Sequence, residues 1–110
     1  MIWQELTSLP QWAEVLQLSW QTPVAVFKHS TRCSISSMAK SRLERDWQGN
    51  KPNFPVFYLD LIAHRDVSNA IAADSGIEHQ SPQLIVLKNG KPVYDGSHNM
   101  IQARQAQASV

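Results

Sequence analysis

Residues 24–33, with the sequence VAVFKHSTRC, join an apolar run to a polar turn and to the only cysteine of the chain. The unbroken run 24–27 is typical of a strand buried on both faces. Cys33 then opens a segment with helical spacing, where free N–H groups and the helix dipole favour a thiolate. Arg32 adds a fixed positive charge. We therefore expect a reactive thiol at a strand-to-helix junction; the alternative is a small, inert core residue, for which a basic turn is a poor place.

Composition narrows the class of protein. A chain of 110 residues, 43% hydrophobic and 17% charged, is the size of one soluble domain, residues 1–110. A net charge of +1 gives no electrostatic reason to expect nucleic acid or a membrane surface as partner. One cysteine excludes an internal disulfide. The sequence shows no secretory leader and no apolar run of roughly 20 residues, so we expect a cytoplasmic protein.

Apolar spacing indicates two helices in the first half of the chain. A capping-box pattern at residues 8–11 begins the first helix, which we expect to bury one face. That face comprises Leu9, Trp12, Ala13, Leu16 and Trp20. The second helix follows Cys33 and ends near residues 49–50. Its apolar stripe comprises Ile35, Ala39, Leu43 and Trp47.

Two further helices are predicted in the second half. The third is short, ends at Gly76 and carries the apolar positions Val67, Ala70 and Ile71. The last begins near Ser97 and includes Met100, Ile101 and Arg104. We expect residues 105–110 to fray.

Four apolar runs, residues 24–27, 56–59, 84–87 and 92–94, predict strands. The first two should be parallel with a right-handed crossover, and the last two should form a hairpin around an Asn-Gly turn. Pro92 suits an edge strand, and residues before position 6 weakly suggest a fifth strand. The fold class is therefore α/β, with a central mixed sheet of four to five strands flanked by helices.

This order of elements resembles the thioredoxin fold over nearly the whole chain, with a cysteine after the first core strand and a proline before the hairpin. The resemblance implies that Pro82 is cis and lies against the nucleophilic sulfur. Two positions depart from thioredoxins: Ser36 replaces their second cysteine, and Phe27 replaces their buried acid. The Cys-x-x-Ser arrangement instead resembles monothiol glutaredoxins, although their Cys-Gly-Phe-Ser string is absent.

A narrower resemblance rests on FKHSTRCSIS at 27–36, VSN at 67–69 and HQSPQ at 79–83. These strings are similar to the bacillithiol-system redox-active proteins of the YtxJ type, which are monothiol thioredoxin-like proteins of bacteria. The resemblance implies thiol-disulfide oxidoreductase activity, with bacillithiol as cosubstrate and no tightly bound cofactor. Its partners would be a low-molecular-weight thiol and its mixed disulfides with proteins.

The implied mechanism depends on one thiol. Cys33 attacks a mixed disulfide, releases the substrate thiol and holds the small thiol until a second thiol or a partner reductase frees it. Ser36, three residues on, lies on the same helix face and could donate a hydrogen bond to the thiolate. The alternative for Ser36 is an ordinary exposed helix serine.

Four residues are candidates for substrate binding. Bacillithiol carries a malate group with two carboxylates, which would suit Lys28 and Arg32; the alternative is that both are solvated loop charges. The backbone of Ser81, just before Pro82, is the expected docking edge for the adduct.

The histidines are weaker candidates. His29 could stabilise the thiolate, but an exposed loop histidine is the commoner case. His64, His79 and His98 lack metal-ligand spacing, and one cysteine cannot complete a closed structural zinc site, so we expect no metal. We expect His79 to form a hydrogen bond with a loop.

Two other functions stay open at this point. An iron–sulfur cluster could be carried by a dimer bridged through Cys33 and two small thiols, although Ser34 replaces the flexible glycine that follows the cysteine in such carriers. The chain could also be a non-catalytic binding module on a thioredoxin scaffold, because a fold alone does not determine function.

Overall fold

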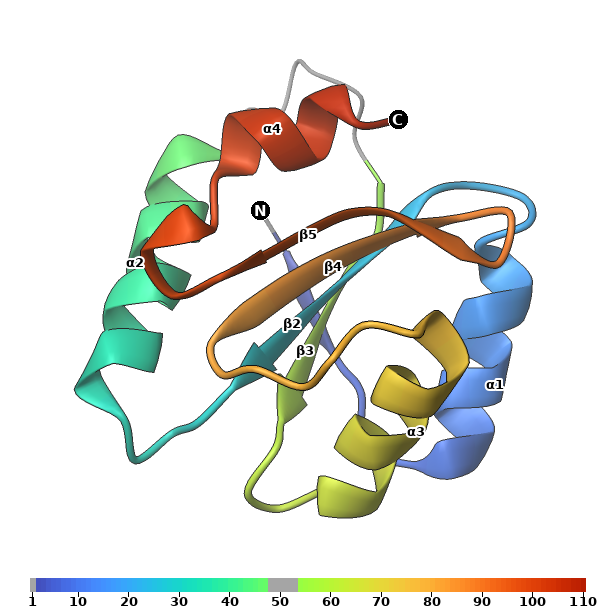
Figure 1. Ribbon diagram of the computed structural model, residues 1–110, viewed down its shortest axis with the longest axis horizontal. Helices are drawn as coiled ribbons and strands as arrows, with labels where there is room; N and C mark the ends of the chain where they lie inside the picture. Colours follow the sequence, from blue (N-terminus) through green and yellow to red (C-terminus); the bar gives the residue numbers. More distant parts are fainter. Residues whose placement is uncertain (1, 48–53) are drawn as a thin grey trace.

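The computed structural model describes residues 2–47 and 54–110 (Figure 1). Within these ranges five strands form one mixed sheet in the order β1-β3-β2-β4-β5. The strands are β1 (Trp3–Glu5), β2 (Val24–His29), β3 (Val56–Asp60), β4 (Gln83–Lys88) and β5 (Lys91–Ser97). The predicted helix stop at residues 49–50 lies outside the described residues.

The pairing of strands confirms the predicted mixed sheet. β3 runs parallel to both β1 and β2, whereas β4 runs antiparallel to β2 and to β5. The hairpin turns at Asn89 and Gly90, whose φ angles of 54° and 75° are those that an Asn-Gly turn favours. Pro92 lies in the edge strand β5, where a missing N–H is tolerated.

Helices cover both faces of the sheet (Figure 1). α1 (Leu9–Leu18) and α3 (Arg65–Ser75) pack on one face, and α2 (Ser34–Asp46) and α4 (Ala103–Ala108) pack on the other. A short 3-10 helix, η1 (His98–Met100), joins β5 to α4. Side chains of β2 alternate between the two apolar cores, so this central strand contributes to both. No helix in the described part of the chain is long and apolar enough to cross a bilayer.

The predicted face of α1 was partly wrong. Its buried residues are Trp12 and Val15, whereas Leu9 is 45% exposed and Trp20 lies beyond the helix end, 62% exposed. The ring of Trp20 instead lies beside the hairpin, about 3.0 Å from the point where Gly90 would carry a Cβ. The predicted cap is confirmed, because the Ser8 hydroxyl accepts a hydrogen bond from the Gln11 N–H at 3.2 Å.

The predicted stripe of α2 needs one correction. Ala39, Leu43 and Trp47 are buried as expected, but Ile35 is 58% exposed. Ser36 occupies the buried place in the first turn, with none of its surface exposed. A polar residue therefore lies in the buried place of the first turn, three positions after Cys33, where an apolar one was predicted.

The predicted C-terminal helix begins too early. β5 continues to Ser97 and η1 follows, so Met100 and Ile101 precede α4. His98 has a φ of 55°, a conformation that would break an α-helix at this point. The expected fraying is also wrong for part of the segment, because Ala106 and Gln107 are buried. The third helix ends as predicted, with Gly76 in the left-handed conformation at φ 74°.

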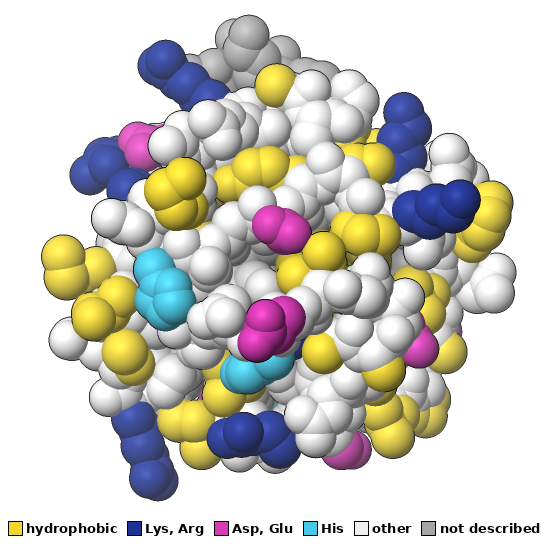
Figure 2. Space-filling view, in the orientation of Figure 1, with side chains coloured by type: hydrophobic (Ala, Val, Ile, Leu, Met, Phe, Trp, Pro, Cys, Tyr) yellow, Lys and Arg dark blue, Asp and Glu magenta, His cyan; other side chains and the backbone are white. Residues whose placement is uncertain are grey.

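The face of the molecule in Figure 2 carries lysine and arginine side chains scattered around its rim. They do not gather into one patch on this face, in keeping with a net charge of +1.

Candidate active site

Cys33 is the N-cap residue of α2 and a free cysteine of intermediate exposure. Its backbone is extended, with φ −110° and ψ 120°, and its side chain makes no capping hydrogen bond. Its N–H donates to the Ser30 carbonyl at 3.1 Å, which closes the turn between β2 and α2. The thiol therefore lies at the start of a 13-residue helix without being fixed by a cap.

A buried polar cluster supports this turn, and we call it the His29 cluster (His29, Ser30 and Ser36). His29 Nδ1 and Ser36 Oγ lie 2.5 Å apart, and the Ser30 N–H donates to Ser36 Oγ at 3.1 Å. The side chain of His29 is 5% exposed, so the expected loop histidine is in fact the buried last residue of β2. Ser36 is likewise not the exposed helix serine of the alternative interpretation.

Aromatic rings and two charges surround His29. Its ring stacks on Phe27 with centroids 5.8 Å apart and lies 5.4 Å from the ring of Tyr58. Burial lowers the pKa of His29 below its usual 6.5, and the positive charge of Lys40 lowers the pKa further. Asp60 acts in the opposite direction. His29 is therefore disposed to be neutral, with Nδ1 able to accept a proton or a hydrogen bond.

A second buried cluster lies on the other face of the sheet, and we call it the Lys28 cluster (Lys28, Ser68 and His79). Lys28 Nζ donates to the Ser68 carbonyl at 3.2 Å and lies 3.3 Å from His79 Nδ1. Ser68 Oγ is 3.2 Å from the same His79 nitrogen. The prediction that His79 bonds to a loop was wrong in its partner, because Lys28 belongs to β2 and Ser68 to α3.

Lys28 requires the largest correction to the predicted site. The sequence suggested either a charge that binds a substrate carboxylate or a solvated loop charge, yet Lys28 is completely buried within β2. Burial lowers its pKa from 10.5 to about 8. Because β2 continues two residues past its apolar run, Lys28 turns toward α3 and the loop before β4. It is thus not placed to meet a substrate carboxylate.

The loop before β4 carries the predicted cis proline. The peptide bond between Ser81 and Pro82 is cis, and Pro82 is buried. Gln83 holds this loop, since its Nε2 donates to the Glu78 carbonyl at 3.0 Å. Gln83 also pairs with Lys28 across the β2–β4 ladder, so the cis-proline loop and the turn before Cys33 leave the same end of the sheet.

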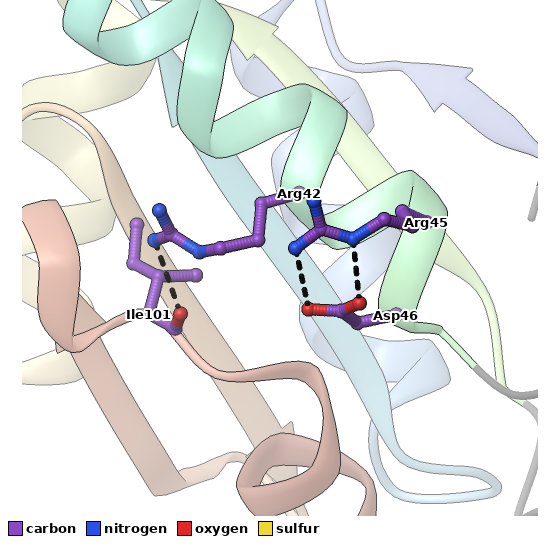
Figure 3. Close-up of polar contacts among 4 residues, drawn as sticks. All are labelled: Arg42, Arg45, Asp46 and Ile101. Carbon is purple, nitrogen blue, oxygen red and sulfur yellow. Dashed lines mark hydrogen bonds and ion pairs between the residues drawn. The ribbon is translucent and has the colours of Figure 1, made fainter.

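Arg42 of α2 links this helix to the segment that follows β5 (Figure 3). Arg42 Nη2 donates to the carbonyls of His98 and Ile101, each at 3.2 Å, and so fixes the segment after β5. In turn the His98 N–H donates to the Pro82 carbonyl at 3.0 Å. The neighbouring Arg45 pairs with Asp46 at 2.9 Å and does not take part.

The structure thus brings together two predicted parts, Cys33 with its turn and the loop of Ser81 and Pro82, at one end of the sheet. Arg32 is exposed beside Cys33. Sequence reasoning missed Ser68, which lies in the VSN string, and undervalued His29. The available signal was the strand itself, because alternation continued past Phe27 would have placed the next two side chains on opposite buried faces.

A lone thiol at a helix N-cap, at the same end of the sheet as a cis-proline loop in a thioredoxin fold, defines the class of monothiol thioredoxin-like proteins. A model of the monothiol bacilliredoxin BrxC family matches residues 4–106. The chain belongs to this family. Family and fold together support a redox function, with low-molecular-weight thiols as the partners that the family suggests.

Solved structures agree on the fold. A proposed oxidoreductase with a thioredoxin fold superposes with a TM-score of 0.80 at 28% identity, over 98% of this chain and 93% of the other. Thioredoxin of Fasciola hepatica gives a TM-score of 0.71 at 11% identity, over 96% and 94% of the two chains. Thioredoxin of Trypanosoma brucei brucei gives a TM-score of 0.69 at 13% identity, over 98% of this chain and 85% of the other.

Proposed function

We propose that this protein is a monothiol thiol-disulfide oxidoreductase that exchanges bacillithiol with oxidised proteins through Cys33. The observation that carries the proposal is a free, partly exposed cysteine at the N-cap of α2, with Ser36 where a resolving cysteine would be, in a member of the monothiol bacilliredoxin family. We also propose that it acts in the cytoplasm, where protein thiols are kept reduced.

The exchange consists of two balanced steps. The Cys33 thiolate attacks the bacillithiol sulfur of a protein–bacillithiol disulfide; that bond breaks, a Cys33–bacillithiol disulfide forms and the substrate leaves as a thiolate that takes up a proton. A second bacillithiol thiolate then attacks the adduct, which yields bacillithiol disulfide and returns Cys33 as a thiolate. With no second cysteine in the chain, the second step needs an external thiol.

Two neighbouring groups would bind the adduct. Arg32 is exposed next to Cys33, so its guanidinium is free to meet a carboxylate of the malate group in a bidentate way. The backbone of Ser81, before the cis bond, would pair with the adduct as a short added strand. Lys28 has no part in this binding.

The proposal is tested by intact-mass spectrometry of reduced protein exposed to oxidised bacillithiol or, in parallel, to oxidised glutathione. We expect one bacillithiol adduct on the wild type, slower glutathione addition and no adduct on Cys33→Ser. Arg32→Gln should slow bacillithiol addition and change glutathione addition less. A wild-type thiol that neither disulfide modifies would overturn the proposal.

A further inference from the structure

We propose that His29 is a positioning residue for Cys33 that acts through the Ser36 hydroxyl. A proton on His29 Nδ1 makes Ser36 a hydrogen-bond donor to the Cys33 sulfur, and loss of that proton withdraws the donor. The inference deepens the proposed function and rests on it for the use of Cys33 in exchange. It concerns how the thiol turn senses the protonation of a buried imidazole.

The Ser36 hydroxyl has two partners, His29 Nδ1 and the Ser30 N–H, and together they decide whether its proton can reach the sulfur. A serine hydroxyl has one proton to donate and two lone pairs that accept. The Ser30 N–H takes one lone pair at 3.1 Å. When His29 Nδ1 carries no proton, the hydroxyl donates to it across the 2.5 Å contact, and no donor is left for another group.

A protonated Nδ1 reverses this contact. The His29 N–H then donates to Ser36 Oγ and occupies its second lone pair, so that the hydroxyl proton must find another acceptor. Ser36 is completely buried, and an unsatisfied hydroxyl there would be costly. In the neutral tautomer that carries its proton on Nε2, His29 thus holds the Ser36 proton, and that proton is released when His29 gains a second one on Nδ1.

The local backbone places Cys33 near this hydroxyl. Cys33 is the N-cap of α2 and Ser36 is its third helical residue, so the two side chains share a face of the first turn. The Ser30 peptide joins them, since its carbonyl accepts the Cys33 N–H and its N–H donates to Ser36 Oγ. The Cys33 side chain has no capping bond and is free to change rotamer toward the hydroxyl.

The charged groups that act on His29 come from the two elements packed against it. Lys40 of α2 disfavours its protonation, and Asp60 at the end of β3 favours it. The rings of Phe27 and Tyr58 both pack against the imidazole. The donor to sulfur is therefore withdrawn at neutral pH and supplied as the pH falls.

The test measures the rate at which uncharged iodoacetamide alkylates Cys33 between pH 4.5 and 8, by intact mass. We expect wild type to show an inflection below pH 6.5, beside the ionisation of the thiol itself. His29→Gln and Ser36→Ala should each lose that inflection. Both variants should react about two- to fivefold more slowly than wild type at pH 5, the factor that one hydrogen bond carries, and equally fast at pH 8.

His64→Gln is the matched control, because His64 begins α3 and makes no side-chain capping bond. This variant should keep the wild-type dependence of the alkylation rate on pH.

A second measurement on the wild type does not depend on the folding of a variant. NMR of the imidazole nitrogens should give a titration midpoint for His29 that coincides with the inflection in the alkylation rate. An inflection that persists in Ser36→Ala, or a His29 midpoint that differs from it, would overturn the inference. Because iodoacetamide is not a bacillithiol disulfide, this test can succeed even where the proposed function fails.

Discussion

Lys28 and His29 are consecutive residues of β2, yet they serve opposite faces of the sheet. Lys28 is completely buried and forms hydrogen bonds with Ser68 of α3 and with His79, which lies shortly before the cis proline in the chain. His29 is also buried and bonds to Ser36 of α2, in the turn that holds the thiol. One strand end therefore supports both parts of the site, one on each face.

The two clusters differ in how much the burial of their titratable side chain lowers the stability of the fold. Burial lowers the pKa of Lys28 to about 8, so below that pH the lysine carries a poorly solvated charge that no carboxylate of the described residues pairs with. His29 avoids this cost by being neutral. The Lys28 cluster therefore ties β2 to α3 and to His79, in the segment before β4, at the expense of stability, whereas the His29 cluster ties β2 to the turn before α2 at little expense.

The largest change in the free energy of unfolding is expected at Lys28, where two substitutions distinguish the volume of the side chain from its charge. Lys28→Ala should lower the free energy of unfolding by about 2–5 kcal/mol, because a long buried side chain leaves a cavity. Lys28→Met keeps the volume and removes the charge, and should be neutral or stabilising. Urea denaturation at pH 7 measures both. Equal losses in the two variants would show that the charge itself stabilises the fold.

The cost of the buried Lys28 charge should also appear in the dependence of the free energy of unfolding on alkaline pH. In the unfolded chain Lys28 keeps its proton up to about pH 10.5, whereas in the folded chain it loses the proton near pH 8. The unfolded state thus binds more protons between these values, and stability should rise by about 3 kcal/mol across this window. The difference between wild-type and Lys28→Met unfolding curves isolates the effect. A difference that is constant with pH would contradict the assigned cost.

Removal of one hydroxyl from each cluster sharpens the comparison. Ser36→Ala leaves both His29 Nδ1 and the Ser30 N–H without their partner, and should cost about 1–3 kcal/mol. Ser68→Ala should cost less, because Lys28 bonds to the Ser68 carbonyl, which the substitution keeps. Thermal denaturation of the two variants in one buffer checks the order, and the reverse order would contradict the assigned roles.

The smallest effect is expected at acid pH. Burial lowers the pKa of both His29 and His79 below 6.5, so below that pH the unfolded chain binds more protons and stability falls. Nearby Lys28 and Arg65 add to the shift of His79, since both repel its charged form. His29→Gln and His79→Gln should each flatten part of the decline. Urea midpoints measured from pH 7 downward test this, and unchanged slopes would contradict it.

The sequence predicted those parts of the site that depend on local chemistry. A cysteine after a strand, a proline before a hairpin and an Asn-Gly turn each act within a few residues, and Cys33, Pro82 and Gly90 lie where expected. The polar clusters could not be predicted in the same way. Lys28 finds Ser68 across 40 positions, and no local pattern encodes such a pairing.

Long-range packing also explains the errors in the helices. Trp20 matched the helical spacing of α1, but the helix ends at Leu18 and the ring covers the hairpin instead. Ile35 matched the stripe of α2, yet the buried place went to Ser36, because His29 offers it a hydrogen bond. Trp20 is thus placed by a contact with the distant hairpin, and Ser36 by a hydrogen bond to a residue seven positions earlier in the neighbouring strand.

Above all, we propose that Cys33 takes bacillithiol from oxidised proteins. The most direct measurement mixes a bacillithiolated protein with reduced wild type or Cys33→Ser and follows both partners by intact mass within one turnover. We expect the substrate to lose one bacillithiol as Cys33 gains one, with no transfer to Cys33→Ser. A substrate that keeps its adduct in the presence of wild type, or loses it equally fast with Cys33→Ser, would contradict the claim.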